Sequence, residues 1–478
     1  MNKTGHNRPG RAASWLLSWL APVVIGFAYF AAYYPGFTNH DSQSIWLNAF
    51  QYVADPMVIP IMDWYAPALN LLRILALKSG LGVAGFHALF CLLTYGTWAA
   101  LVATLLSRPW HRFYAHGLLL LPFIGANLAF QVPDTWLAIG FAWLIIALRL
   151  GVFTGSPRKH AWLVPSLYFF GSLLLLGSRQ NALLVLPVLM AVPWLLNCHP
   201  SLAVRRACIA APLTALIAVQ AIAFTMPLRE QHKADIYMAF ETIGVWKSIV
   251  ASRSAVELAD LQPPRVFAAL SQPPAYYLAR WNPSDVDAII WDLPEFADRS
   301  NFNEPVAGMI RKDFFRFVFR HPLHYARMKL SFARNGLGLS APDALPVSSP
   351  PTDAWIDQLG IPLHHTPLFK PLTMRLLDHV YASQPLWAPL SAPLAWWMAA
   401  IVVYIWRYEQ RRVTRFDAGW LTLIAAYYLT ILLFAPIYLP RYVFPVWVVL
   451  GVGTIRLLLA PSPLPELTPS KADRDSIK

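Results

Sequence analysis

Charged residues are scarce in this sequence. Only 13% of its residues are charged, whereas soluble globular proteins carry about 25%. Hydrophobic residues make up 57% of the chain, and apolar runs of about 17 residues or more recur along it. This composition argues against a soluble globular protein and predicts an all-α integral membrane protein.

Cysteine and the common enzyme motifs are also rare or missing. The cysteines Cys91, Cys198 and Cys208 fit neither a disulfide framework nor a metal-ligand spacing, so we interpret them as packing residues. The sequence has no P-loop, no dinucleotide glycine fingerprint and no nucleophile elbow. It also lacks strand-like alternation and repeats of solenoid length. Nucleotide-dependent and hydrolase activities of those types are therefore not expected.

The apolar runs predict about ten transmembrane helices. We place them at 15–34, 82–107, 115–132, 135–153, 161–177, 182–196, 208–226, 386–406, 418–437 and 442–460. The first run is longer than the apolar core of a usual signal peptide, so we interpret it as a retained span. A further apolar helix at 67–77 is too short to cross comfortably, and we expect it to lie along the surface or to re-enter.

Basic residues define the orientation of these spans. With ten spans, the following groups all fall on one face: Lys3, Arg8 and Arg11; Arg108 and Arg112; Arg158 and Lys159; Arg205 and Arg206; Arg407, Arg411, Arg412 and Arg415. The positive-inside rule makes this face cytoplasmic, so both termini are expected in the cytoplasm. The net charge of +13 therefore follows from topology, and we expect no nucleic-acid partner.

The spans divide the chain into three predicted parts. Residues 1–226 form an N-terminal transmembrane module with the first outer loop, and residues 386–478 form a C-terminal transmembrane module with a cytoplasmic tail. Between them, residues 227–385 form a proline-rich, mostly helical insertion on the outer face. Within this insertion, Ser284 is a plausible helix N-cap. The segment 310–332 mixes basic and aromatic residues, as does a helix that lies on a membrane surface.

Several ionisable residues share the predicted outer face. They are Asp41, Asp55 and Asp63 in the first loop, Asp134 in "QVPDTW", Arg179 in "GSRQNALL" and Arg441 in "LPRYVFP". An ionisable group at the membrane boundary is energetically unfavourable unless it is paired with an opposite charge or serves a function. One carboxylate could act as a general base, and a second as its partner or as a metal ligand. Two guanidinium groups could hold a lipid phosphate, from which a sugar would be transferred with inversion.

Simpler interpretations stay open for each of these residues. Asp41 and Asp134 both stand where a helix begins, so either could serve only as a cap. Arg179 and Arg441 could anchor lipid headgroups. We interpret Asp55 and Asp63 as solvated loop acids, and His321 and His324 as ordinary surface or packing residues.

An ordered series of short motifs resembles one enzyme superfamily. The motifs are "YYPGFTNHDSQSIWLNAF", "MDWYAPALNLLRIL", "PDTWLAI", "SRQNALLVLP", "RHPLHYARMKL" and "LPRYVFPV". In this order they resemble bacterial members of the GT-C superfamily, which are multi-span glycosyltransferases that use polyprenyl-phosphate sugars. The resemblance touches points along nearly the whole chain.

The resemblance implies catalytic roles for two acids. Asp41 corresponds to the first-loop acid that is taken as the catalytic base, and Asp134 corresponds to a second acid that holds a metal in some members. The chain departs from the family where Tyr65 and Ala66 replace an expected His-Pro. It also has a single acid, followed by Ser42, where many relatives have a pair. A divalent metal held by Asp41 and Asp134 is thus left open.

The resemblance also implies a substrate-binding set. Arg441 and Arg179 are expected to contact the donor phosphate. Trp64 and Tyr442 lie in the same motifs and complete the predicted set.

These expectations describe an inverting membrane glycosyltransferase. It would move a sugar from a polyprenyl-phosphate carrier to a cell-envelope acceptor (a lipid, a polysaccharide or a protein) on the outer face of the bacterial inner (plasma) membrane. Apart from membrane lipids, its partners would be the lipid-linked donor and the acceptor. One alternative is a transporter or flippase for an anionic lipid or lipid-linked sugar, although the sequence shows no related halves. Another is a non-catalytic envelope assembly subunit.

Overall fold

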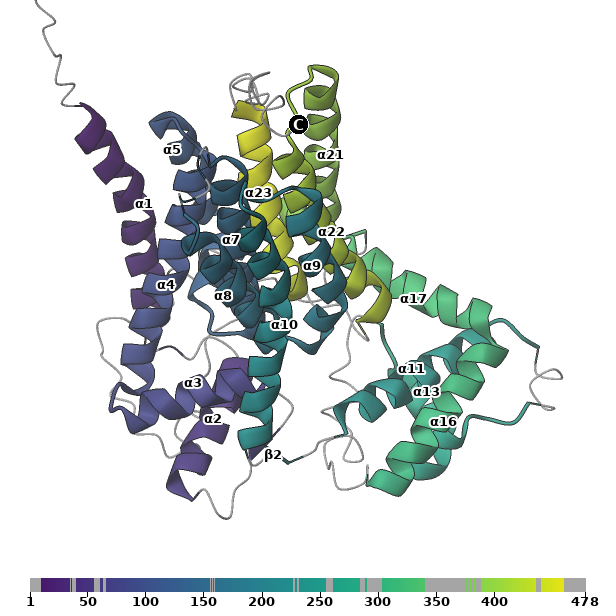
Figure 1. Ribbon diagram of the computed structural model, residues 1–478. Helices are drawn as coiled ribbons and strands as arrows, with labels where there is room; N and C mark the ends of the chain where they lie inside the picture. Colours follow the sequence, from purple (N-terminus) through teal and green to yellow (C-terminus); the bar gives the residue numbers. More distant parts are fainter. Residues whose placement is uncertain are drawn as a thin grey trace, which may run out of the picture.

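The computed structural model describes most of the chain. The described residues are 10–34, 36, 40–55, 61–62, 66–154, 156, 158, 160–226, 228–229, 232–254, 261–283, 289, 303–339, 375, 379, 382, 388–435 and 440–459. Within them, 17 α-helices and one pair of two-residue strands form a helical bundle with a smaller helical lobe at its side (Figure 1). The prediction of an all-helical protein is confirmed.

The bundle contains most of the helices. They are α1 (Gly10–Ala32), α4 (Gly82–Leu105), α5 (Pro109–Gly117), α6 (Pro122–Ala129), α7 (Pro133–Val152), α8 (Leu163–Ser178), α9 (Leu186–Leu195), α10 (Leu202–Thr225), α21 (Pro393–Glu409), α22 (Arg415–Phe434) and α23 (Phe444–Leu459). Short 3₁₀ helices lie between them: η1 (Leu118–Leu120), η2 (Gln180–Val185), η5 (Ala388–Ser391) and η6 (Pro440–Val443). Two further helices, α2 (His40–Ala54) and α3 (Pro67–Lys78), lie at the lower end of the bundle (Figure 1).

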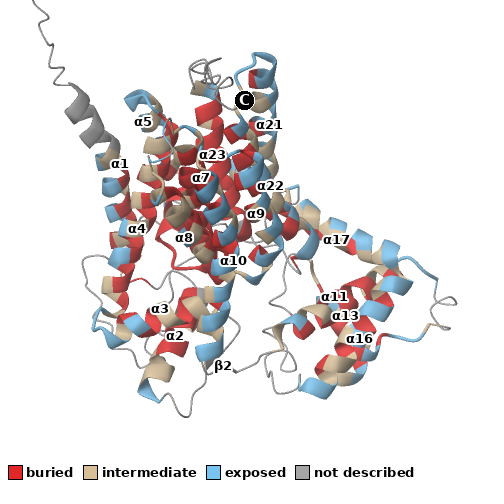
Figure 2. Cartoon of the chain, viewed as in Figure 1, coloured by how far each residue is buried: buried red, intermediate tan, exposed pale blue. Residues whose placement is uncertain are grey.

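Four helices are long and apolar enough to cross a membrane, namely α4, α7, α10 and α22. The chain thus has the character of a multi-pass membrane protein, as its composition predicted. Helix α7 is central, with 78% of its most apolar window buried, whereas the corresponding share of α10 is 22%. Figure 2 shows this contrast between a buried centre and a more exposed periphery. The exposed residues of α10 include the apolar Ile217 and Phe224, as expected of a helix that faces lipid.

The predicted spans coincide with helices, but three of them are wrong as single helices. The segment 386–406 is divided into η5 and α21, because Ala392 is extended before Pro393. The segment 115–132 is divided into the end of α5, η1 and α6, because Leu121 precedes Pro122 and is extended, at φ −74° and ψ 118°. A residue before proline avoids the helical region, so the helix ends there. The segment 182–196 likewise begins as η2 and becomes α-helical only at Leu186.

One end of the bundle carries the basic segments. Figure 1 places the first described turn of α1, the last turn of α23, helix α5 and the turn between α21 and α22 at the upper end. The predicted cytoplasmic groups around Arg108 and Arg411 belong to these segments. The opposite, lower end carries α2 and α3, from the predicted first outer loop.

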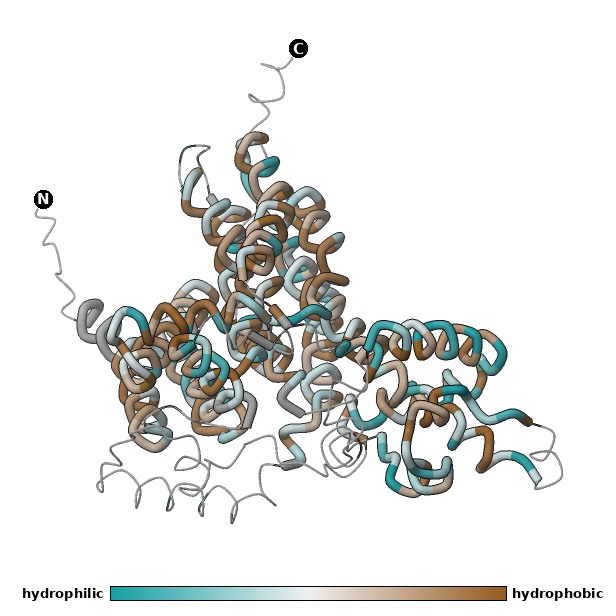
Figure 3. The backbone as a smooth tube through the Cα atoms, turned by 90° about the horizontal axis from the view of Figure 1, so that it is seen from below, coloured by the Kyte–Doolittle hydropathy of each residue, from teal (hydrophilic) through white to brown (hydrophobic). Residues whose placement is uncertain are grey.

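The lobe beside the lower part of the bundle is built from α11 (Lys233–Val250), η3 (Arg265–Ala269), α13 (Pro274–Arg280), α16 (Glu304–Arg320) and α17 (Pro322–Gly336). It comes from the predicted insertion, and it is visibly more hydrophilic than the bundle (Figure 3). The segment 310–332, expected as one surface helix, is divided between α16 and α17. His321 leaves the helical region at φ −129° and ψ 53° because Pro322 follows it. Ser284 lies outside the described residues.

Two short strands join the first outer loop to the lobe segment. Strand β1 (Ile61–Met62) pairs in parallel with β2 (Leu228–Arg229), with Ile61 opposite Leu228 and Met62 opposite Arg229. The backbone that leads into Trp64 is therefore tied to the chain that leaves α10.

Candidate functional site

The ends of three helices converge at the lower end of the bundle. Helix α7 begins at Pro133, which fits the first helical position because proline has no amide hydrogen to lose there. Helix α8 is its antiparallel neighbour and ends at Ser178, while α23 packs against α7 and begins at Phe444. The predicted residues Asp134, Arg179 and Tyr442 stand at these three ends. The fold therefore brings together three positions that lie far apart in the sequence.

Asp134 and Arg179 form a bidentate ion pair. Arg179 donates from Nε to Asp134 Oδ1 over 2.6 Å and from Nη2 to Oδ2 over 2.7 Å. Asp134 is completely buried, and the Arg179 side chain is only 18% exposed. Two parallel charge-assisted hydrogen bonds are the strongest geometry available to such a pair, and burial removes competition from water. Asp134 is therefore the counter-ion of Arg179 in addition to lying in the first turn of α7.

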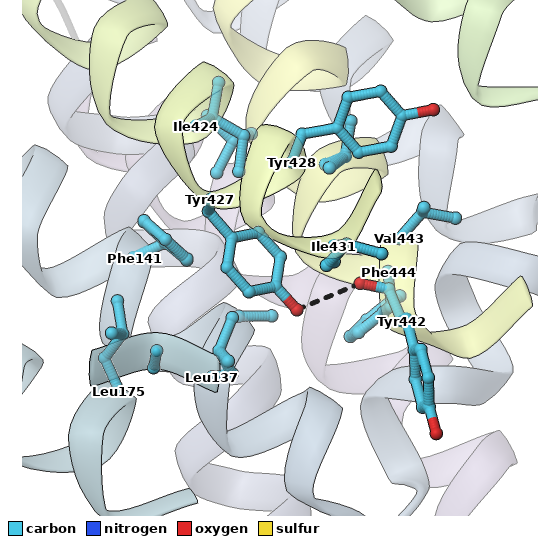
Figure 4. Close-up of a cluster of buried hydrophobic side chains, with 14 of the residues drawn as sticks. Leu137, Phe141, Leu175, Ile424, Tyr427, Tyr428, Ile431, Tyr442, Val443 and Phe444 are labelled. Carbon is cyan, nitrogen blue, oxygen red and sulfur yellow. Dashed lines mark hydrogen bonds between the residues drawn. The ribbon is translucent and has the colours of Figure 1, made fainter. Parts of the chain in front are cut away.

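Tyr442 completes this cluster. The Arg179 guanidinium carbon lies 3.9 Å from the centre of the Tyr442 ring, which is a close cation–π contact. The backbone of Tyr442 is held separately, because the hydroxyl of buried Tyr427 donates to its carbonyl oxygen over 3.0 Å. Figure 4 shows the Tyr427 hydroxyl directed at this carbonyl from within an apolar cluster, while the Tyr442 ring points away from that cluster. Helix α22 thus fixes the start of α23 against α7 and α8.

A second buried polar group lies beside α2 and was not predicted as a functional residue. Arg73 of α3 is completely buried; it donates from Nη2 to the Gln131 carbonyl over 2.6 Å and from Nη1 to the Leu69 carbonyl over 3.0 Å. Its guanidinium carbon lies 5.6 Å from the Trp46 ring centre and 5.7 Å from that of Phe86. One basic residue in the otherwise apolar stretch "NLLRILAL" was the signal that could have identified it.

Gln131 connects this group to the segment that precedes α7. Its side-chain oxygen accepts a hydrogen bond from Trp46 Nε1 over 3.1 Å, and its Nε2 lies 3.2 Å from His87 Nδ1. Gly36 packs against the same side chains, and a Cβ there would stand 2.6 Å from Gln131 Nε2. At φ +124°, this position of the "YPG" motif also requires glycine for its backbone. Helix α2, helix α3 and the start of α7 are thus held as one unit.

One polar side chain in this region has no partner within the described part of the chain. The amide of Asn70, one turn after the start of α3, is completely buried, and neither its oxygen nor its nitrogen makes a hydrogen bond to a described residue. Buried amides are normally satisfied, because an unmade bond costs about 1–3 kcal/mol. This end of α3 is therefore more polar than helix packing alone requires.

The other predicted site residues are only partly placed. Asp41 lies in the first turn of α2, whose buried side includes Ser42, Ile45 and Trp46. The side chains of Asp41 and Arg441, and all of Trp64, lie outside the described residues. Asp55, interpreted as a loop acid, is exposed after the end of α2.

The described side chains hold no ready-made metal site. No group of three or more His, Cys, Asp or Glu residues comes together among them. Both carboxylate oxygens of Asp134 already accept hydrogen bonds from Arg179, so a metal ion at Asp134 would have to compete with that pair. A search of protein-family profiles, curated proteins and solved structures finds no match to this chain.

Proposed function

We propose that this chain is a membrane glycosyltransferase that moves a sugar from a polyprenyl-phosphate carrier to a cell-envelope acceptor. The observation that carries the proposal is the convergence at one end of the bundle. There α2, with Asp41 in its first turn, lies in the unit that Arg73 and Gln131 tie to the start of α7, where Asp134 binds Arg179. The ordered resemblance to the GT-C superfamily supports the same chemistry.

The proposed topology has about ten spans, with both termini in the cytoplasm and the site on the outer face of the bacterial plasma membrane. In support, the beginning of α1 and the last turn of α23 lie at the same end of the bundle in Figure 1. Four shorter apolar helices would cross together with the four long ones, namely Trp19–Ala32 of α1, α8, η2 with α9, and α23. The segment 115–132 and helix α21 would complete the ten. The donor tail would then stay in the bilayer while its phosphate reaches the outer boundary.

In the proposed reaction, Asp41 accepts the proton of an acceptor hydroxyl group. The hydroxyl oxygen attacks the anomeric carbon, the bond from that carbon to the phosphate oxygen breaks with inversion, and polyprenyl phosphate leaves. Arg441 binds the phosphate, and Trp64 lies along the substrate. We assign Arg179 to the same boundary, where Asp134 and Tyr442 fix its guanidinium group. Its interaction with Asp134 limits how far it moves to meet the phosphate.

Mass spectrometry of envelope glycans and lipids tests this proposal. Cells would carry the wild-type protein, no protein, Asp41→Asn or Asp55→Asn, each variant at equal abundance. We expect the deletion and Asp41→Asn to lose the same sugar, because a general base typically contributes about 10²–10⁴-fold to rate. Asp55→Asn is the matched control, an exposed acid at the other end of the same helix, and should resemble the wild type.

The other outcomes are equally informative. If Asp41→Asn matches the wild type while the deletion does not, Asp41 is only a helix cap and the transferase mechanism is wrong. Uptake of a lipid-linked sugar into vesicles without a covalent product would instead identify a transporter or flippase. A phenotype for the deletion with neither transfer nor uptake would identify an assembly subunit.

A further inference from the structure

The outer lobe carries a basic surface without acidic neighbours in its sequence. From residue 314 to residue 339 the chain has no Asp or Glu, and its Lys and Arg residues are Arg316, Arg320, Arg327, Lys329 and Arg334. Lys329 is paired with Glu241, whereas the four arginines are exposed. Positive charge therefore accumulates on the surface of α16 and α17.

One face of α17 combines these charges with exposed leucines. Leu323, Arg327, Leu330 and Arg334 follow one another at intervals of four, three and four residues, so they share one side of the helix. We call these four residues the Leu–Arg stripe. Leu323 is 73% exposed and Leu330 is 62% exposed.

The opposite face of α17 forms part of the lobe core. Met328 and Phe332 are buried, and the Phe332 ring lies 6.1 Å from that of Trp281. Because α17 packs on α11 and α16 through this buried side, the Leu–Arg stripe points away from the lobe. The end of α16 adds Phe315 and Phe319, which are 49% and 80% exposed and lie beside Arg316 and Arg320 in the sequence.

Two contacts fix the orientation of α17 relative to the bundle. Tyr428 of α22 donates a hydrogen bond to the Gly336 carbonyl over 2.7 Å, and Lys329 Nζ donates to the Ala435 carbonyl over 3.2 Å. Helix α17 therefore ends beside the lower end of α22, and from there its axis runs sideways, with α11, α13 and α16 beneath it (Figure 1). The Leu–Arg stripe consequently faces the zone that surrounds the bundle, where a bilayer would lie.

We propose that the Leu–Arg stripe rests on the outer leaflet of the membrane. Its leucines, with Phe319, would enter the boundary between headgroups and acyl chains, and its arginines would bind the phosphates of anionic headgroups. Leucine alternating with arginine suits this interface: the arginines are too costly for the hydrocarbon core, and the leucines are unfavourable in water. This surface depends on a membrane around the bundle and not on the transferase activity.

Lipid quenching of a fluorescent label tests the proposal on the full-length protein. A nitrobenzoxadiazole label would be placed at Leu330→Cys, and the protein reconstituted into nanodiscs of phosphatidylcholine and phosphatidylglycerol with a doxyl group on part of the acyl chains. The native cysteines are buried, so they do not compete for the label. Glu304→Cys is the control position, exposed at the opposite end of α16. We expect a clear loss of emission at position 330 and none at position 304.

The charges are tested in the same background. Adding Arg327→Gln and Arg334→Gln should reduce quenching at position 330 in discs with phosphatidylglycerol and change it little in pure phosphatidylcholine. Equal quenching at positions 330 and 304 would overturn the proposal. The same result is expected if the Leu–Arg stripe binds a protein partner and not the membrane. If quenching at position 330 is the same with and without phosphatidylglycerol, and with and without the arginine substitutions, the arginines do not bind anionic headgroups and that part of the proposal is wrong.

Discussion

At the scale of single residues, the bundle end is organised by two arginines, the largely buried Arg179 and the completely buried Arg73. Arg179 is neutralised by Asp134 through two short hydrogen bonds, and Arg73 donates to the carbonyls of Leu69 and Gln131. A buried ion pair contributes little net stability compared with apolar residues of similar volume, but breaking it is expensive. Such groups therefore fix the relative positions of the helix ends more than they add to the free energy of unfolding.

The first prediction concerns the Asp134–Arg179 pair. Asp134→Asn leaves the Arg179 charge buried without its counter-ion and should lower stability by about 3–5 kcal/mol. The double variant Asp134→Leu with Arg179→Met replaces both charges and should recover most of that loss. Thermal unfolding in detergent, followed by tryptophan fluorescence, measures both effects. If the double variant unfolds as early as Asp134→Asn, the pair is not the source of the cost. Sugar transfer should be lost in both variants.

The second prediction concerns Arg73. Arg73→Gln shortens the side chain and removes the guanidinium group that donates to the Leu69 and Gln131 carbonyls, which should cost about 1–3 kcal/mol and loosen α2 against the start of α7. Arg73→Lys keeps a cation near Trp46 but cannot serve both carbonyls at once, so its transfer rate should be intermediate. The control is Arg280→Gln, since Arg280 also contacts an aromatic ring but is exposed. Transfer and melting temperature are the measurements, and identical behaviour of Arg73→Gln and Arg280→Gln would contradict the assignment.

At the scale of elements, α7 and α8 approach closely because both carry glycine at their crossing. A Cβ at Gly140 would stand 2.7 Å from the Gly171 carbonyl oxygen, and a Cβ at Gly171 would stand 2.8 Å from that of Gly140. Small residues allow helix backbones to approach in this way in membrane proteins. The crossing determines the spacing of the α7 and α8 ends, where Asp134 meets Arg179.

A pair of alanine substitutions tests this crossing. Gly140→Ala forces backbone atoms apart and should cost about 1–3 kcal/mol. Gly96→Ala is the matched control within α4, where a Cβ would meet nothing within 4 Å. There alanine should raise stability by up to about 1 kcal/mol through its greater helix propensity. Opposite shifts in melting temperature are expected, and a Gly140→Ala protein as stable as Gly96→Ala would show that the helices separate without cost.

At the scale of the whole molecule, a buried charged group joins the lobe to the bundle. Glu241 of α11 accepts hydrogen bonds from Lys329 and from Tyr325 of α17, and Lys329 reaches the Ala435 carbonyl beyond α22. Burial raises the pKa of Glu241, because the loss of hydration outweighs the attraction of Lys329. The folded lobe therefore binds a proton more readily at this site than the unfolded chain does.

The sign of the resulting pH dependence follows from linkage. Stability from this group is complete below the unfolded pKa of Glu241 and is lost as pH rises through the raised folded value. Glu241→Gln should flatten this decline. Burial also raises the pKa of Asp235 despite the nearby Arg311, so a slope of the same sign should persist in that variant. Hydrogen-exchange protection factors of α17 between about pH 4 and pH 8 measure this pH dependence of stability. Glu409→Gln, at an exposed acid of α21 outside the lobe, is the control, and an unchanged slope in Glu241→Gln would contradict the prediction.

The sequence by itself determined where most helices form and which end of the bundle carries the basic segments. Apolar runs are local, so they predicted the helices α4, α7, α10 and α22, and "DSQSIWLNAF" predicted the start of α2. Only the tertiary structure decided which polar groups meet. Asp134 and Arg179 are 45 residues apart, and Arg73 and Gln131 are 58 apart. Such contacts depend on how helices pack, and no local pattern of residues encodes that packing.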